Sequence, residues 1–124
     1  AYCIPIEGLG LWGMVYGYLA LEANLDTVMG ITFYQHKETP GLGGEIDKQW
    51  WQSQWPGKQI FDESGELVSV TVKKGLVDDA IPREAKHYVD GLSGATITSN
   101  GVTKFVREDL EKYMPYFDKL KKKG

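Results

Sequence analysis

The residues of this chain whose types and spacing best suit chemistry form the run DGLSGAT at residues 90–96. Serine and threonine hydroxyls stand between glycines there, directly before a pattern typical of a helix. Gly91 and Gly94 lack a Cβ, so the backbone can turn tightly or approach another group closely. The hydroxyl of Thr96 is therefore expected where a bend of the chain meets a helix.

The helix that follows is expected to begin near Asn100, with Thr98 or Ser99 as its N-cap. The free amides and the dipole of a helix start favour a negative group, above all a phosphate. A hydroxyl just upstream, that of Thr96, is well placed to hold a phosphorylated ligand or to carry one covalently. Simple capping, which is what most such hydroxyls do, is the alternative interpretation.

The heptapeptide resembles the flavinylation motif of covalent FMN-binding domains, Asp-Gly-x-Ser/Thr-Gly-Ala-Thr, at every fixed position. Such domains occur in the C subunit of the Na⁺-translocating NADH:quinone reductase and in the G subunit of the related ferredoxin:NAD⁺ electron-transport complex. The resemblance implies that Thr96 carries FMN as a phosphoester, attached by a separate flavin transferase with FAD as donor. It also implies that Asp90 belongs to the signature that the transferase recognises. The phosphate is then expected to be surrounded by the neighbouring residues Ser93, Gly94, Ala95 and Thr98.

A second tract, ETPGLG at residues 38–43, also resembles this family and stands in the family's order relative to the first. Pro40 stiffens this loop, and its glycines expose backbone groups that suit the polar rim of a flat heterocycle. The resemblance implies that Glu38, Thr39 and Leu42 lie against the isoalloxazine, with Thr39 as a hydrogen-bonding candidate. A plain connecting loop is the alternative interpretation.

Length and composition favour a single soluble globular domain over residues 1–124, with 42% hydrophobic and 25% charged residues. The net charge of −3, without a basic stripe, argues against nucleic acid as a partner. Cys3 has no second cysteine and no His/Cys cluster near it, so neither an internal disulfide nor a metal site is expected. The sequence offers no Ser-His-Asp arrangement and no paired carboxylates. No catalytic residues are therefore expected, and the redox chemistry would be that of the cofactor.

Apolar runs predict two long strands, at residues 11–21 and 27–36, joined as an antiparallel pair. The first of these strands is apolar on both faces, so it is expected to be central and covered on both sides. Residues 1–10 are expected to be rich in turns. The run GLGLW at residues 8–12 is a third point of resemblance to the family, and it is expected to lie near the flavin.

Further along the chain, residues 45–55 predict a short amphipathic helix with Trp50 pointing inward. Alternation predicts a strand at residues 67–74. An apolar stripe predicts a helix from Asn100, which Pro115 is expected to break or kink. This order of elements predicts the α+β class, with a mainly antiparallel sheet and helices packed on it.

The resemblance implies an electron-transfer flavoprotein domain that relays electrons within the Na⁺-translocating NADH:quinone reductase. Its partners would be the other subunits of that membrane complex and, during maturation, the flavin transferase. The location implied is the periplasmic side of a bacterial inner membrane, with a membrane-anchoring helix in the full-length protein. The G subunit of the ferredoxin-linked complex, or another extracytoplasmic FMN carrier, is one alternative. A non-redox interaction module, in which Thr96 is only a cap, is the other.

Overall fold

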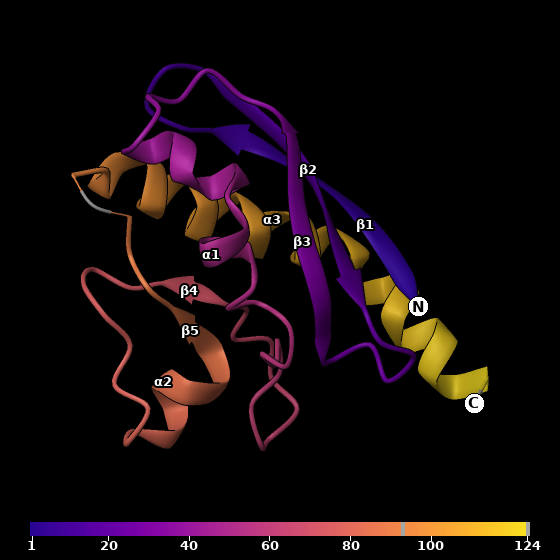
Figure 1. Cartoon of the computed structure of the whole chain (residues 1–124). Helices are drawn as coiled ribbons and strands as arrows, with labels where there is room; N and C mark the ends of the chain where they lie inside the picture. Colours follow the sequence, from indigo (N-terminus) through magenta and orange to yellow (C-terminus); the bar gives the residue numbers. More distant parts are fainter. Residues whose placement is uncertain (93, 124) are drawn as a thin grey trace.

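Three antiparallel strands form the main sheet of this protein, in the order β1-β2-β3. The computed structural model describes residues 1–92 and 94–123, without the side chains of the last two. The strands are β1 (Tyr2–Leu9), β2 (Met14–Leu21) and β3 (Val28–Gln35). The helices that Figure 1 shows gather on one side of this sheet. The predicted α+β class, with a mainly antiparallel sheet and packed helices, is confirmed.

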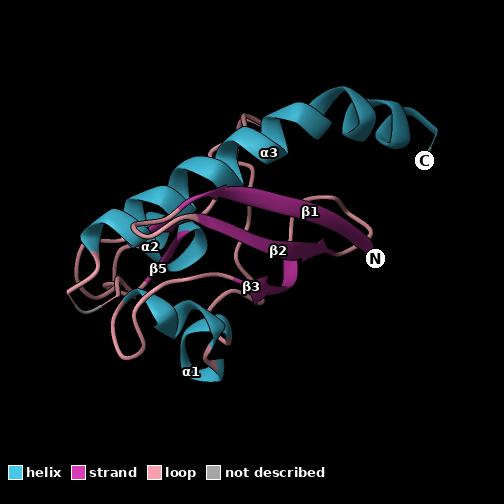
Figure 2. Cartoon of the chain, turned by 90° about the horizontal axis from the view of Figure 1, so that it is seen from above, coloured by secondary structure: helices cyan, strands magenta, loops and turns pink. Residues whose placement is uncertain are grey.

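Shorter elements and one long helix follow the sheet. In chain order they are η1 (Gly43–Asp47), α1 (Gln49–Gln52), β4 (Thr71–Val72), α2 (Pro82–His87), β5 (Tyr88–Val89) and α3 (Thr96–Lys123). The two short strands β4 and β5 pair in parallel as a separate sheet. Figure 2 shows α3 running along β1, with α1 on the β3 side of the molecule. Both therefore contribute to the core beneath the main sheet.

Strand β2 is central, as predicted, but only one of its faces is covered by described residues. Val15, Leu19 and Leu21 are fully buried, whereas Met14 and Tyr18 are 38% and 41% exposed. The expectation of cover on both faces is therefore wrong for the part of the chain that the structure describes. Periodicity reports how apolar a face is, and it says nothing of whether a neighbouring element lies on it.

The first residues form an edge strand, so the expectation of a turn-rich start is wrong. Ile4 and Ile6 of β1 are 3% and 1% exposed and belong to the core. Pro5 stands between them, opposite Tyr18 of β2. A proline lacks the N–H that a central strand needs, but an edge strand tolerates it.

Helix α3 begins at Thr96, earlier than the expected Asn100, and continues through Pro115. The predicted apolar stripe is confirmed by the burial of Val102, Phe105, Val106 and Leu110. Phe117, beyond the proline, is 1% exposed, and its ring stacks on that of Tyr113 at 6.4 Å. Burial of Phe117 holds the last turns on the core, so Pro115 does not break the helix as expected.

The tryptophan-rich segment consists of two short helical pieces, where the sequence predicts one helix. Trp51 and Trp55 are fully buried and meet edge-to-face at 5.6 Å. Trp50 is 51% exposed, so the expectation that it points inward is wrong. Further on, the strand expected over residues 67–74 is reduced to β4, because Ser69 adopts a left-handed φ of 61° that no strand residue has.

Candidate functional site

The loop that carries the second motif lies against the turn that precedes α3. Thr98 Oγ1 donates a hydrogen bond of 2.8 Å to Glu38 Oε1. A Cβ at Gly43 would lie 2.6 Å from Thr98 Oγ1, and a Cβ at Gly94 would lie 3.0 Å from Leu42 Cδ2. The fold thus brings the two sequence motifs into contact, and the contact leaves no room for a side chain at Gly43.

Thr96 is the first residue of α3, and its side chain is exposed to solvent. Among the described residues, the first backbone bond into the helix is that of Ser99 N–H, which donates to the carbonyl of Ala95 at 3.0 Å. The expected caps do not cap, because the Thr98 hydroxyl donates to Glu38 and the Ser99 hydroxyl accepts from Leu92 N–H at 3.3 Å. The N-cap prediction is therefore wrong, and Thr96 lies in the first turn itself.

The backbone amides at the start of α3 are candidates for binding an anion. The backbone N–H groups of Thr96, Ile97 and Thr98 donate to no acceptor among the described residues. Such groups, together with the helix dipole, favour a negative group at this end. The exposed Thr96 hydroxyl is therefore next to backbone N–H groups that have no acceptor among the described residues and that suit phosphate oxygens.

Glu38 is a buried carboxylate, 5% exposed, that joins three segments of the chain. Besides Thr98, it accepts from Leu11 N–H at 2.7 Å and from Trp12 N–H at 3.0 Å. The neighbouring Thr39 hydroxyl accepts from the Trp12 indole N–H at 3.0 Å. The turn before β2, the second motif and the first turn of α3 are thus held in one arrangement.

The expected site residues have different environments in the fold. Leu42 is 41% exposed, and Gly94 is exposed with a φ of +62°. Ala95 and Thr98 are buried, at 4% and 1% exposure, so the Thr98 side chain is not free for a ligand. The structure places Glu38, Thr39, Leu42, Gly94, Ala95, Thr96 and Thr98 within one connected region, whereas Ser93 lies outside the described residues.

Asp90 lies at the start of the motif and is held by its neighbours. Its side-chain Oδ1 accepts from Val77 N–H at 2.8 Å. Its carbonyl accepts from the buried Trp51 indole at 2.9 Å, and its N–H donates to Gln54 at 2.8 Å. These bonds fix the entry of the chain into the motif.

A small groove of about 40 Å³ opens beside Thr96 and is partly lined by Lys73 and Lys74. A Cβ at Gly91 would lie 2.2 Å from the Lys73 carbonyl, so only glycine allows the motif to pass there. Lys73 forms an ion pair with Glu84, whereas Lys74 pairs with no carboxylate among the described residues. Lys74 therefore offers a free cation near Thr96. Sequence reasoning missed it, because a lysine at the end of a strand pattern carries no signal of its own.

Exposed apolar side chains lie on the segments around Thr96. They come from the end of β1, the turn before β2, the second motif and the first turn of α3, and they are Leu9, Leu11, Trp12, Leu42 and Ile97, each between 41% and 68% exposed. Apolar side chains this exposed offer surface to a flat aromatic ligand or to a partner protein.

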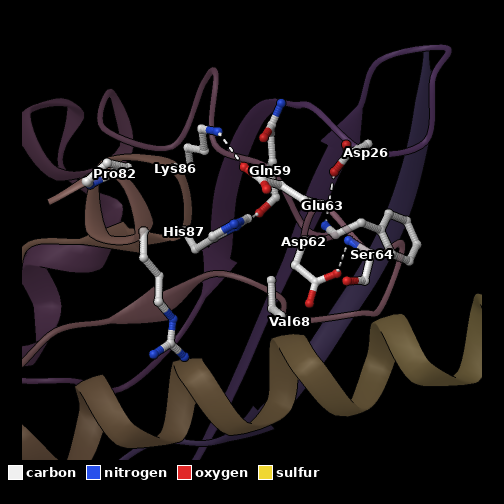
Figure 3. A pocket seen from close by; sticks show the side chains of 11 residues that line it. Asp26, Gln59, Asp62, Glu63, Ser64, Val68, Pro82, Lys86 and His87 are labelled. Carbon is white, nitrogen blue, oxygen red and sulfur yellow. Dashed lines mark hydrogen bonds and ion pairs between the residues drawn. The ribbon is translucent and has the colours of Figure 1, made fainter.

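A larger cavity, of about 590 Å³, lies between α2 and the segment that follows α1, and it contains none of the motif residues. Figure 3 shows Lys86 reaching toward Glu63, a pair separated by 3.9 Å, and Asp62 bonded to Ser64. His87 Nδ1 is 2.6 Å from the carbonyl of Gln59. Several of these polar groups are bonded to one another, and no residue of either motif lines this cavity.

The described residues contain no group of three or more His, Cys, Asp or Glu side chains that could hold a metal ion. None of the helices over the described range is long and apolar enough to cross a membrane.

Comparison with known proteins defines the class to which this site belongs. The FMN-binding domain family matches residues 10–111, and the chain belongs to this family. The chain is similar to the C subunit of the Na⁺-translocating NADH-quinone reductase of Pseudomonas aeruginosa, with 54% identity over 101 residues, which are 80% of this chain and 37% of that protein. It is 50% identical over 99 residues to the same subunit of Yersinia pestis, covering 80% of this chain and 35% of that protein.

Solved structures of the same kind of subunit share the fold. The chain superposes on the C subunit of the Na⁺-translocating NADH-quinone reductase from Parabacteroides distasonis with a TM-score of 0.80 and 39% identity, over 94% of this chain and 56% of that one. For Shewanella oneidensis NqrC the TM-score is 0.84 and the identity 38%, over 96% and 54% of the two chains. The resemblance found in the sequence is thus confirmed, and the chain spans about half of the solved relatives and little more than a third of the curated ones.

Proposed function

We propose that this domain carries FMN as a phosphoester on Thr96 and relays electrons as part of a Na⁺-translocating NADH:quinone reductase. The observation that carries the proposal is the contact between the two motifs at an exposed hydroxyl in the first turn of α3. Membership of the FMN-binding domain family supports the identity of the ligand. Similarity to the C subunit of that reductase supports the choice of complex.

The residues around Thr96 suit the phosphate end of FMN. The Thr96 hydroxyl oxygen would form the new bond to phosphorus, while the transferase breaks the phosphoanhydride of FAD and AMP leaves with the electron pair of that bond. The hydroxyl proton would pass to the transferase. The amides of Thr96, Ile97 and Thr98 would then donate to the phosphodiester oxygens, and the Lys74 ammonium would offset their charge.

The other segments suit the flat end of the cofactor. When bound, FMN supplies the redox chemistry, and the protein positions it. Leu42 and Trp12 present exposed apolar surface to a ring, whereas Glu38 fixes the backbone of the Trp12 turn from within the core. Because these side chains are exposed, a ring lying on them would keep an edge open to a neighbouring protein. An open edge is what electron exchange with other subunits requires.

The wider context is part of the same proposal. We infer partners among the other subunits of the reductase, a flavin transferase for maturation, and a membrane-anchored full-length protein on the periplasmic side of a bacterial inner membrane. The G subunit of the ferredoxin-linked complex stays as the nearest alternative. A non-redox interaction module is favoured by one observation only, the set of exposed apolar side chains around Thr96.

Coexpression with the flavin transferase, in a host that exports the domain, tests this function. Intact mass spectrometry should show the mass of one added FMN, and peptide mapping should place it on Thr96. Thr96→Val removes the hydroxyl at nearly constant shape and should abolish the adduct, whereas Thr96→Ser keeps a hydroxyl and should retain it in part. Flavin that survives denaturation in Thr96→Val would show a different attachment residue. An unmodified wild-type domain under these conditions would favour the interaction module.

A further inference from the structure

The outer face of the main sheet, on the side away from the helices, is largely apolar, with Glu7 of β1, opposite Tyr16, as the one charged residue on the described strands. In β2 and β3 its residues are Met14, Tyr16, Tyr18, Ala20, Met29, Thr32 and Tyr34, without a single charge. Met29 and Tyr34 are 49% and 61% exposed. The ring of Tyr34 stacks against those of Tyr16 and Tyr18, with centroids 6.3 and 5.5 Å apart. In Figure 1 no described element covers this side.

A face of this composition is unusual for a sheet in water. An antiparallel sheet with one solvated face normally alternates apolar and polar residues. Here the alternation is between buried aliphatic side chains and exposed aromatic or methionine side chains. A contiguous exposed apolar patch of this kind is typical of an interaction surface.

The two edge strands of the main sheet, β1 and β3, differ in how well their backbone groups are protected. On β1, the buried Asp109 of α3 accepts from Glu7 N–H at 2.8 Å, and Pro5 has no N–H to offer. Strand β3 contains neither a charge nor a proline. Val28 bonds to residues 57 and 58, but no hydrogen bond joins the backbone of residues 29–35 to any described residue outside β2.

Natural proteins protect free edges with charges, prolines or covering elements, because an unprotected edge recruits another strand. Edge β1 is protected in this way, whereas β3 has neither a charge nor a proline and, beyond Val28, no hydrogen-bonded neighbour other than β2 among the described residues. The open face and the open edge meet on the same strand, which is the geometry that β-strand addition requires.

We propose that the outer face and the β3 edge bind a polypeptide segment of the same protein, homologous to the part of its relatives that lies outside the region shared with this chain. The solved relatives share 94% and 96% of this chain, yet the shared region is only 56% and 54% of their own length. Nearly half of each relative therefore lies outside the shared fold. This segment adds a strand to β3 and covers Tyr18, Tyr34 and Met29. The surface includes none of the residues proposed to hold FMN.

Cys3 provides a built-in reporter of this contact. It is free and exposed, and it pairs with Ala20 on the outer face of β1 and β2. The experiment compares the isolated domain with a chimera in which this chain replaces the shared region of Shewanella oneidensis NqrC. In the folded chimera, alkylation of Cys3 by iodoacetamide and amide exchange of residues 29–35 should each slow by about tenfold or more, as expected for groups that react only after local opening.

Charged substitutions locate the contact. Met29→Lys should leave the Tm of the isolated domain within about 2 °C, because an exposed side chain contributes little to stability. Tyr34→Lys also removes the ring stacking on Tyr16 and Tyr18 and should lower that Tm by a few degrees, so its effect in the chimera is measured relative to the isolated variant. In the chimera both variants should lower the Tm and restore fast alkylation of Cys3. Leu76→Lys is the matched control, since Leu76 is 76% exposed and lies outside the main sheet.

A second measurement does not need the chimera to fold. The S. oneidensis residues outside the shared region, added as a separate chain, should slow Cys3 alkylation in the wild-type domain and not in Tyr34→Lys. Equal reactivity of Cys3 and of residues 29–35 with and without these residues overturns the proposal. Protection that depends only on the concentration of the isolated domain overturns it too, because the occupant is then a second copy.

Discussion

Glu38 and Thr98, separated by 60 residues in the sequence, share a hydrogen bond of 2.8 Å between two buried side chains. Glu38 also accepts from the backbone of Leu11 and Trp12. The position of the first turn of α3 therefore depends on a carboxylate in a distant loop. Thr96 lies in the same turn, two residues before Thr98, so its position depends on that carboxylate too.

Replacing Glu38 should destabilise the domain and impair flavinylation together. Glu38→Ala leaves three buried or partly buried donors without an acceptor, which should cost about 3 kcal/mol in the free energy of unfolding. Glu38→Gln keeps one acceptor oxygen and should cost about half as much. Urea denaturation measures the stability, and denaturing gels under ultraviolet light measure the covalent flavin.

The matched control for this change is Glu111→Ala. Glu111 is exposed and forms only an i,i+4 pair with Arg107 at 3.1 Å, so its loss should cost at most about 0.5 kcal/mol. Retention of full stability in Glu38→Ala would contradict the role given to this carboxylate.

A side chain at Gly94 should disturb both backbone and motif contact. Gly94 has a φ of +62°, and its Cβ would lie 3.0 Å from Leu42 Cδ2. Gly94→Ala should cost about 1–2 kcal/mol from the left-handed backbone alone and should also lower the yield of flavinylation. Gly65→Ala, at a φ of +82° with nothing within 4 Å, should cost a similar amount and leave flavinylation unchanged. Equal flavinylation in both variants would argue against a role for the Gly94–Leu42 contact.

Lys74 should matter for the anion and not for the fold. Lys74→Ala should change the free energy of unfolding by no more than about 0.5 kcal/mol, because the side chain is exposed. The rate of flavinylation should fall, and raising the ionic strength should reduce the difference from wild type, since exposed charges are screened. Lys119→Ala, another exposed lysine, is the control and should behave as wild type. The measurement is the initial rate of flavin incorporation at low and high salt.

Asp109 should stabilise the protein mainly through the β1 edge. Asp109→Leu removes the acceptor of Glu7 N–H and should cost about 2 kcal/mol in the free energy of unfolding. Lys112→Ala leaves that bond in place and should cost much less. The loss should be visible as a lower midpoint in urea. An unchanged midpoint in Asp109→Leu would show that the edge is held by other contacts.

The ion pair between Asp109 and Lys112, 3.2 Å apart, predicts that the stability of the fold depends on pH in the alkaline range. The hydrogen bond to Asp109, followed by its charge, raises the pKa of Lys112 above the usual 10.5. A raised pKa in the folded state stabilises the protein while the lysine is protonated. This contribution is complete below the usual pKa and is lost as the pH rises through the raised one. A wild-type protein should therefore lose more stability than Lys112→Ala across that range, which thermal melts at increasing pH would measure.

Local patterns in the sequence predicted the elements whose burial is regular. The strand at residues 27–36 and the stripe of α3 repeat with the period of their element, and the structure confirms both. Boundaries were less accurate. Strand β1 was missed because Pro5 and two glycines resemble a turn, and an edge strand tolerates what a central strand excludes. Pro115 was expected to break or kink α3; the helix continues past it, and the burial of Phe117 helps to hold the last turns on the core.

The candidate site was predicted in part. Both motifs were found by their resemblance to a family, and the assignments of Thr96 and its neighbours to FMN stay predictions. The role of Thr98 could not be predicted from the sequence, since its hydroxyl donates to Glu38, which is 60 residues away, and does not cap the helix. Lys74 was missed for a similar reason, because only the pairing of β4 with β5 brings its segment beside the motif.

The sequence by itself determined the class of the domain and the chemical identity of its two motifs, because periodicity and short residue patterns are properties of neighbours along the chain. The tertiary structure alone decided which hydroxyl is free and which is buried, and which face of the main sheet is left open. Those outcomes depend on contacts between residues far apart in sequence, such as Glu38 with Thr98. No local pattern encodes such contacts.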